Sequence, residues 1–145
     1  MKLIVSRVLS AACSVDGVVT GRIDKGLLVY VGFAPADKVD EVEYMIDRVR
    51  KMRIFEDDAG KMNRSVEDVG GEVLWVPNFT LYADPSSRRP SFSGAMAFAD
   101  AKSLFDYLLQ ADARWTGHPA QAGVFGADMR VESEALGPVN VIVER

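Results

Sequence analysis

Apolar residues recur with two different periods along the chain, and these periods predict strands in some segments and helices in others. Alternating apolar positions predict short strands at residues 2–9 and 13–23. Within the second segment, Val15-Asp16-Gly17-Val18 is typical of a hairpin, because Asp-Gly tolerates the positive φ of a tight turn. Residues 26–34 are apolar on both faces, which predicts a central buried strand that Pro35 ends.

Two segments have the three- and four-residue apolar spacing of amphipathic helices. The first runs from Val39 to Met52, and Asp37 is its predicted N-cap. The second follows a loop rich in Ser, Arg and Pro at residues 85–94. Its predicted inward-facing residues are Phe98, Ala101, Phe105, Leu108 and Leu109.

The second half of the chain contains the remaining predicted strands. A strong strand at 72–76 is expected to continue at 79–82 beyond Pro77, and two strands at 124–133 and 139–143 close the chain. Strands and helices do not alternate strictly, and we find neither a repeat nor a linker. The pattern predicts one domain over residues 1–145, with an α+β fold in which a curved, mostly antiparallel, barrel-like sheet carries two amphipathic helices.

Composition narrows the function classes further. The chain of 145 residues is 48% hydrophobic and 26% charged, which is typical of a globular protein. Its longest apolar stretch is far shorter than a membrane span, and no signal peptide is evident, so we expect a cytoplasmic protein without membrane contact. The net charge of −4 disfavours extended binding to DNA, although it leaves a local contact with an RNA end open.

Few residues have the usual catalytic or metal-binding chemistry. Cys13, in an alternating strand, is expected in the core, and His118 is expected at the surface. With one Cys, one His and no carboxylates at ligand spacing, we expect neither a metal nor another cofactor. The basic run Arg48–Arg53 has two interpretations: cations that favour a helix C-terminus, or a contact with RNA phosphate.

Two short motifs are harder to explain as scaffold. In Pro77-Asn-Phe-Thr-Leu81, a proline interrupts a strong strand and removes a ladder donor. Gly137-Pro138 begins the last predicted strand, and a Gly-Pro bond is able to adopt the cis form. Each motif taken alone is also compatible with an ordinary turn or bulge.

An ordered set of short motifs resembles the D-aminoacyl-tRNA deacylase (D-tyrosyl-tRNA deacylase) family over essentially the whole chain. The matching segments are Arg7-Val8, Gly26-Leu-Leu-Val, Arg53-Ile-Phe, Gly60-Lys-Met-Asn63, Phe79-Thr-Leu81, Arg89-Pro-Ser-Phe92, Ala127-Asp-Met129 and Gly137-Pro-Val139. Single fragments such as Arg-Pro-Ser-Phe are weak signals, whereas the ordered set in a chain of the family's usual length is a strong one.

The resemblance implies a homodimer that hydrolyses the ester between a D-amino acid and the 3′-terminal adenosine of tRNA, and so acts in chiral proofreading. It implies that Gly137 and Pro138 of one subunit project into the other subunit's pocket. There, their carbonyl oxygens would engage the substrate's α-amino group and leave no space for an L side chain. The residues implied to bind substrate are Gly137, Pro138, Pro77, Phe125 and Met129, and those implied in catalysis are Asn78, Phe79 and Thr80.

The sequence departs from the family's Ser-Gln-Phe-Thr-Leu signature at two positions. Pro77 replaces the serine and Asn78 the glutamine, and a relaxed-specificity branch also has proline at the first of these positions. An aminoacyl ester is already activated, and its ribose 2′-hydroxyl is able to organise the attacking water. The protein then needs mainly orientation and oxyanion donors, such as N–H groups around Phe79 and Thr80. Thr80 as a covalent nucleophile is the second hypothesis, because no base to activate it is evident.

Two interpretations from other classes remain at this point. One is a non-catalytic module that binds the aminoacyl-tRNA 3′ end, which Pro77-Asn78 would favour if it disabled hydrolysis. The other is a structural dimer in which Gly137-Pro138 is an ordinary turn. Expected substrates of the enzyme include glycyl-tRNA, since glycine has no side chain to exclude.

Overall fold

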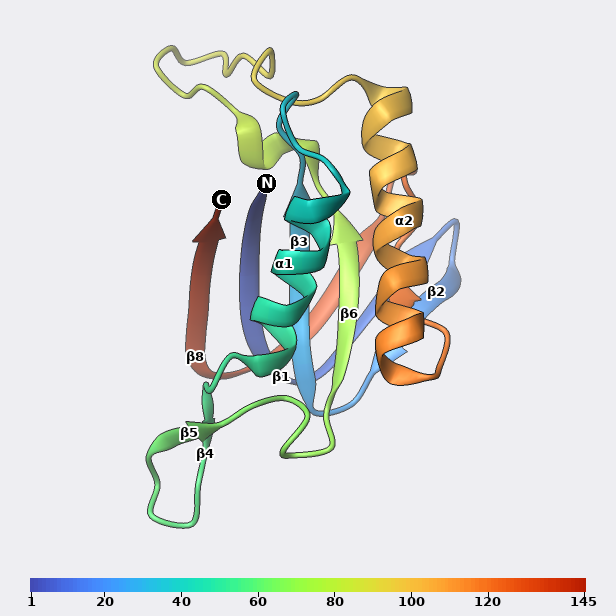
Figure 1. Ribbon diagram of the computed structural model, residues 1–145. Coiled ribbons are helices and arrows are strands. Elements are labelled where there is room, and N and C mark those ends of the chain that lie inside the picture. Colours follow the sequence, from blue (N-terminus) through green and yellow to red (C-terminus); the bar gives the residue numbers. More distant parts are fainter.

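The computed structural model describes residues 1–145 and contains one six-stranded sheet, a small second sheet and two long helices (Figure 1). The strands are β1 (Lys2–Val15), β2 (Val18–Ile23), β3 (Gly26–Gly32), β4 (Phe55–Glu56), β5 (Met62–Arg64), β6 (Glu72–Pro77), β7 (Gln121–Ala122) and β8 (Arg130–Glu144); the helices are α1 (Val39–Lys51), the 3₁₀ helix η1 (Phe79–Tyr82) and α2 (Phe98–Thr116).

The main sheet is mixed and nearly closed. Its order is β2-β1-β3-β6-β7, and β8 pairs with β1 on the outside of this path. The pairs of β1 with β2, β3 and β8 are antiparallel, whereas β3–β6 and β6–β7 are parallel. At the closing edge, the Arg22 N–H donates to Gln121 Oε1 at 3.0 Å. The predicted barrel-like α+β fold is therefore confirmed.

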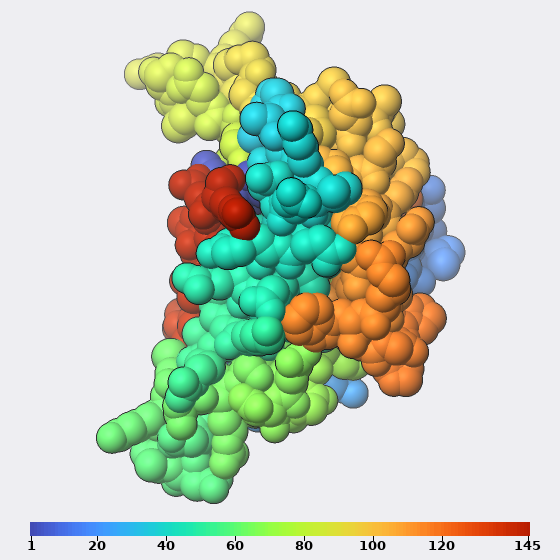
Figure 2. Space-filling view, viewed as in Figure 1, coloured from blue at the N-terminus to red at the C-terminus, as the bar shows by residue number.

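Two apolar clusters fill the molecule, one on each side of the sheet. The larger cluster of 21 buried residues lies under α1 and α2, which cover the same face of the sheet in Figures 1 and 2, and it includes Trp75 and Phe105. The smaller cluster of seven lies inside the curve of the sheet and includes Cys13. Cys13 is a fully buried core residue, as its alternating strand predicted.

The hairpin between β1 and β2 confirms the prediction from Asp16-Gly17. Both residues have positive φ, 49° and 79°, as a tight two-residue turn requires.

No helix of the structure is both long enough and apolar enough to cross a bilayer.

Several local predictions are wrong. The two strands expected at 124–133 and 139–143 are one continuous strand, β8, which begins only at Arg130. Residues 79–82 form the 3₁₀ helix η1 and not a strand, because the Asn78 side chain accepts from the N–H two residues later and turns the chain. The N-cap of α1 is Lys38, while the Asp37 carboxylate binds the Ala34 N–H and the N-terminal ammonium. Phe98 is 65% exposed and not part of the core, since it opens α2 at the rim of a pocket.

Candidate active site

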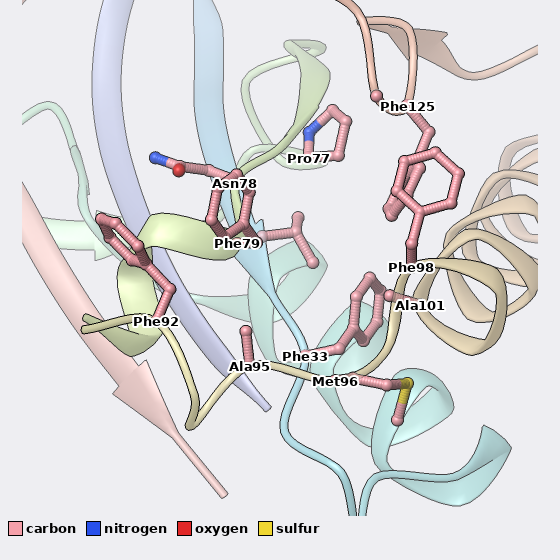
Figure 3. A pocket seen from close by; sticks show the side chains of 12 residues that line it. Phe33, Pro77, Asn78, Phe79, Phe92, Ala95, Met96, Phe98, Ala101 and Phe125 are labelled. Atoms are coloured by element: carbon pink, nitrogen blue, oxygen red, sulfur yellow. The ribbon is translucent and has the colours of Figure 1, made fainter. Parts of the chain in front are cut away.

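One apolar pocket of about 390 Å³ opens at the carboxyl ends of β3 and β6 (Figure 3). Nine of its 12 lining residues are hydrophobic, and its volume is within the range of small-molecule sites. The lining residues are Val31, Phe33, Pro77, Asn78, Phe79, Phe92, Ala95, Met96, Phe98, Ala101, Phe125 and Gly126.

Two aromatic pairs flank this pocket. Phe79 and Phe92 meet edge to face with ring centroids 5.3 Å apart, and Phe98 and Phe125 do the same at 5.1 Å. Figure 3 shows the two pairs on different sides of the pocket. Phe79 is 58% exposed. Clusters of solvent-exposed aromatic rings beside a cavity are typical of a binding surface.

The polar wall of the pocket is the turn that follows β6. The Asn78 N–H donates to the Val31 carbonyl at 2.7 Å, which anchors the turn to the end of β3. Asn78 Oδ1 accepts from the Thr80 N–H at 3.1 Å and from the Thr80 hydroxyl at 2.5 Å. The first N–H groups of a helix have no partner within the helix, so the Phe79 N–H at the start of η1 is the turn's candidate donor to a ligand.

Gly137 and Pro138 lie on β8, outside the pocket of their own chain. The bond between them is cis, and the φ of Gly137 is 127°. They lie where the β1–β8 register is interrupted between Ser6 and Val8, whereas the pocket lies beyond the Lys2–Gly32 end of β1 and β3.

A buried arginine holds the segment that precedes Pro138. Arg7 is 5% exposed; its Nε donates to the Leu136 carbonyl at 3.0 Å and its Nη1 to the Ile54 carbonyl at 2.7 Å. A Cβ at Gly137 would lie 3.1 Å from Arg7 Nη2. The guanidinium thus fits closely against Gly137 and leaves that position little room for a side chain.

The structure brings some of the predicted site residues together and leaves others apart. Pro77, Asn78, Phe79 and Phe125 line the pocket. Thr80 lies on the same turn, bonded to Asn78. Met129 packs with the smaller apolar cluster and does not line the pocket, and Gly137 and Pro138 are separate from it.

Sequence reasoning did not assign several pocket residues to the site. Phe33, Ala95 and Met96 carry no recognisable chemistry, so only their position at the ends of β3 and of the loop before α2 identifies them. Phe92 lies in the matched Arg89–Phe92 segment, and that motif was the one available signal for it.

The ionisable groups near the turn are few. Burial, followed by the charges of Asp37 and Glu144, raises the pKa of Tyr82 to about 12, so this phenol stays neutral at physiological pH. His118 is exposed, and its backbone N–H donates to the Thr116 hydroxyl. His118 does not line this pocket. No group of three or more His, Cys, Asp or Glu residues is arranged to hold a metal ion.

Comparison with known proteins identifies the family. The family model of D-Tyr-tRNA(Tyr) deacylase matches residues 4–144. The D-aminoacyl-tRNA deacylase of Deinococcus radiodurans is 47% identical over 99% of this chain and 99% of its own length.

Two solved structures also share the fold. One, titled c-Myc DNA Unwinding Element Binding Protein, is 32% identical with a TM-score of 0.94 and covers 100% of this chain and 99% of that one. The other, described as a probable eukaryotic D-amino acid tRNA deacylase, is 15% identical with a TM-score of 0.85, over 98% and 97% of the two chains, and supports the fold alone. With the family model matching nearly every residue, the chain belongs to the D-Tyr-tRNA(Tyr) deacylase family.

Proposed function

We propose that the protein hydrolyses the ester that joins a D-amino acid to the 3′-terminal adenosine of tRNA, which recycles the tRNA and releases the D-amino acid. The observation that carries this proposal is the family match over residues 4–144, together with the full-length relative named for this activity. The substrate implies that the protein works where tRNA is charged and used, in the cytoplasm.

The pocket suits the end of an aminoacylated RNA. Exposed aromatic faces such as those of Phe79 and Phe92 are able to stack a nucleobase, as proteins commonly do with unpaired RNA bases. The apolar interior, with Phe33 and Met96, is able to accept an amino-acid side chain. Asn78 and the start of η1 then lie on the wall where the ester would be bound.

The chemistry requires little from side chains, because an aminoacyl ester is already activated. We propose that the Phe79 N–H stabilises the developing oxyanion and that the ribose 2′-hydroxyl helps to organise the attacking water. The Thr80 N–H is bonded to Asn78 and therefore contributes by fixing the turn. Thr80 as a covalent nucleophile ranks second, since its hydroxyl donates to an amide oxygen, which is a poor base.

The site would be completed by a second subunit. Gly137 and Pro138 are exposed on the edge strand β8 and lie away from the pocket of their own chain, so a homodimer with a two-fold interface is the arrangement that brings them to a pocket. Their carbonyl oxygens would bind the substrate's ammonium group, and their backbone would fill the volume of an L side chain. Such steric exclusion discriminates far better than an apolar pocket does.

Mixing two variants that are each strongly impaired in the hydrolysis of D-Tyr-tRNA tests this shared site. Asn78→Ala disables the pocket and Gly137→Ala disables the projecting segment. Random exchange of subunits makes half of the dimers mixed, and one of the two sites in each mixed dimer is intact, so the mixture should recover about a quarter of wild-type activity. No recovery after verified exchange, or a fully active monomer in light scattering, would refute the shared site.

The direct test of the function compares tRNA charged with D-Tyr, L-Tyr and Gly under the same conditions. We expect hydrolysis of the D-Tyr and Gly esters and sparing of the L-Tyr ester, without added metal and in the presence of a chelator. Binding of all three without hydrolysis in a single turnover would favour the non-catalytic module instead. Comparable hydrolysis of L-Tyr-tRNA would place the protein in the relaxed-specificity branch that shares proline at position 77.

A further inference from the structure

A short hairpin loop projects beside the pocket and carries two adjacent arginines. Asp84 and Ser91 close this loop: the Asp84 N–H donates to the Ser91 carbonyl at 2.7 Å, and the Ser91 N–H donates back at 3.1 Å. Figure 2 shows the loop as a projection from the body of the molecule. Arg88 and Arg89 are near the middle of its sequence, and both are exposed.

Internal hydrogen bonds define the loop and do not use the arginine side chains. The Asp84 carboxylate accepts from the Ser86 N–H at 3.0 Å. The Ser87 hydroxyl donates to the Arg89 carbonyl at 2.5 Å and accepts from the Arg89 N–H at 3.2 Å. Replacing either guanidinium should therefore leave the loop conformation intact.

Neither guanidinium has a partner within the protein. The ion pairs of the structure engage Arg50, Arg64 and Arg114 but neither Arg88 nor Arg89, although the chain has an excess of four negative charges. Two neighbouring, exposed and unpaired guanidinium groups are suited to bind phosphate, which they contact through a planar fork of N–H donors.

The base of the loop belongs to the pocket wall. Phe92 lines the pocket and packs on Phe79, while Arg89 is three residues away, at most about 11 Å of backbone. A nucleic-acid strand whose terminal nucleoside occupies the pocket, and which leaves it over this rim, has its next phosphates near the loop. Aminoacyl groups and adenosine have no such charge, so the loop would act on the strand alone.

From this placement we infer that Arg88 and Arg89 bind the phosphates of the nucleotides that precede the terminal adenosine of the tRNA acceptor strand. This inference rests on the proposed function for its ligand, and it assigns the recognition of RNA, as distinct from the aminoacyl ester, to the loop. The contact is electrostatic, so it should set affinity and its salt dependence while leaving the hydrolytic step unchanged.

A binding experiment separates this inference from the proposed catalysis. The ligands are an acceptor minihelix carrying D-Tyr in a non-hydrolysable amide linkage on its terminal adenosine, and the matching D-tyrosyl-adenosine amide without phosphates. The variants are Arg88→Gln/Arg89→Gln and the control Arg22→Gln/Lys61→Gln. The control removes two exposed cations that also lack an ion pair, one on β2 and one in the loop between β4 and β5.

We expect the loop variant to weaken minihelix binding about five- to tenfold at moderate salt, and to flatten the plot of log Kd against log salt by about 1.4, or 0.7 for each lost contact. Its Kd for the adenosine amide should equal that of the wild type, and the control should match the wild type with both ligands. An unchanged minihelix Kd and salt slope, or an equal loss with both ligands, would overturn the inference. If the wild type binds the minihelix in this way but does not cleave D-Tyr-tRNA, the proposed function fails and the phosphate contact holds.

Discussion

Asn78 binds Thr80 twice: its side-chain oxygen accepts both the Thr80 N–H, at 3.1 Å, and the Thr80 hydroxyl, at 2.5 Å. This pair closes the turn between β6 and η1, and the Phe79 N–H lies between the two residues at the open start of that turn. The two hydrogen bonds thus fix the turn that positions the Phe79 N–H, the one backbone donor that the proposed chemistry uses.

Substitutions at Asn78 should separate stability from turnover. Asn78→Ala removes the cap of η1 and should cost about 1 kcal/mol of unfolding free energy, together with most of the turnover. Asn78→Asp keeps an acceptor for Thr80 but places a negative charge beside the proposed oxyanion. It should therefore retain the Tm and lower kcat. Urea unfolding and single-turnover kinetics check both variants; an Asp variant with normal kcat would exclude an oxyanion at this wall.

Removing the Thr80 hydroxyl distinguishes the two chemical hypotheses. Thr80→Val keeps the N–H bond to Asn78 and loses only the hydroxyl, so kcat should fall about tenfold or less if water attacks the ester directly. Rapid-quench kinetics of the wild type should then lack a burst of acyl-enzyme. A burst, combined with a loss of about 10⁴-fold or more in the variant, would establish Thr80 as the nucleophile.

Gly137→Ala should disturb the segment that, in the proposed dimer, one subunit projects into the pocket of the other. An added Cβ would lie 2.9 Å from Val139 Cγ2 and 3.1 Å from Arg7 Nη2, at a φ of 127° that L side chains rarely adopt. We expect a cost of about 1–3 kcal/mol and a lower ratio of kcat/KM between D-Tyr- and L-Tyr-tRNA. Ala135→Gly, a nearby change on β8, serves as the control; an unchanged ratio in a folded dimer would show that Gly137 is not part of the chiral filter.

The buried ion pair beneath the helices should matter for stability and not for catalysis. Asp112, which is fully buried on α2, accepts from Arg50 at 2.9 and 2.7 Å and from Trp75 Nε1 at 3.0 Å. Asp112→Ala leaves the Arg50 charge buried without a partner and should cost about 3–5 kcal/mol.

The paired change Arg50→Met/Asp112→Leu should recover much of that loss, because it removes both charges at once. Denaturant unfolding measures each variant, with kcat of the folded fraction as the second readout. A single variant that loses less than about 1 kcal/mol would contradict the role of the pair in stability.

Tyr82 should make the fold sensitive to alkali. Its pKa is raised from 10.0 to about 12, chiefly by burial, so the fold favours the neutral phenol. That contribution to stability is complete below pH 10 and is lost as the pH rises through about 12. Tyr82→Phe should lower the pH dependence of the unfolding free energy in this window. In a pH titration followed by phenolate absorbance, the variant should have one tyrosine fewer that ionises near pH 12 than the wild type has. Identical titration curves of variant and wild type would contradict the assignment.

The sequence predicted those parts of the fold that depend on local pattern. Residues 39–52 form α1 almost as their three- and four-residue spacing indicates, and Asp16-Gly17 forms the predicted turn, because helical periodicity and positive φ are properties of a few consecutive residues. The ordered motifs also identified the family, which the match over residues 4–144 confirms.

What the sequence could not predict depends on contacts between distant segments. Residues 79–82 have the composition of a strand, yet the Asn78 side chain and the Val31 carbonyl bend them into η1. Phe98 fits the apolar face of α2 but lies at the rim of a pocket beside Phe125, where no core covers it. Local pattern decided α1 and the Asp16-Gly17 turn, whereas η1, the pocket and the position of Gly137 away from it were decided only when the sheet closed, because burial is a property of the packed chain.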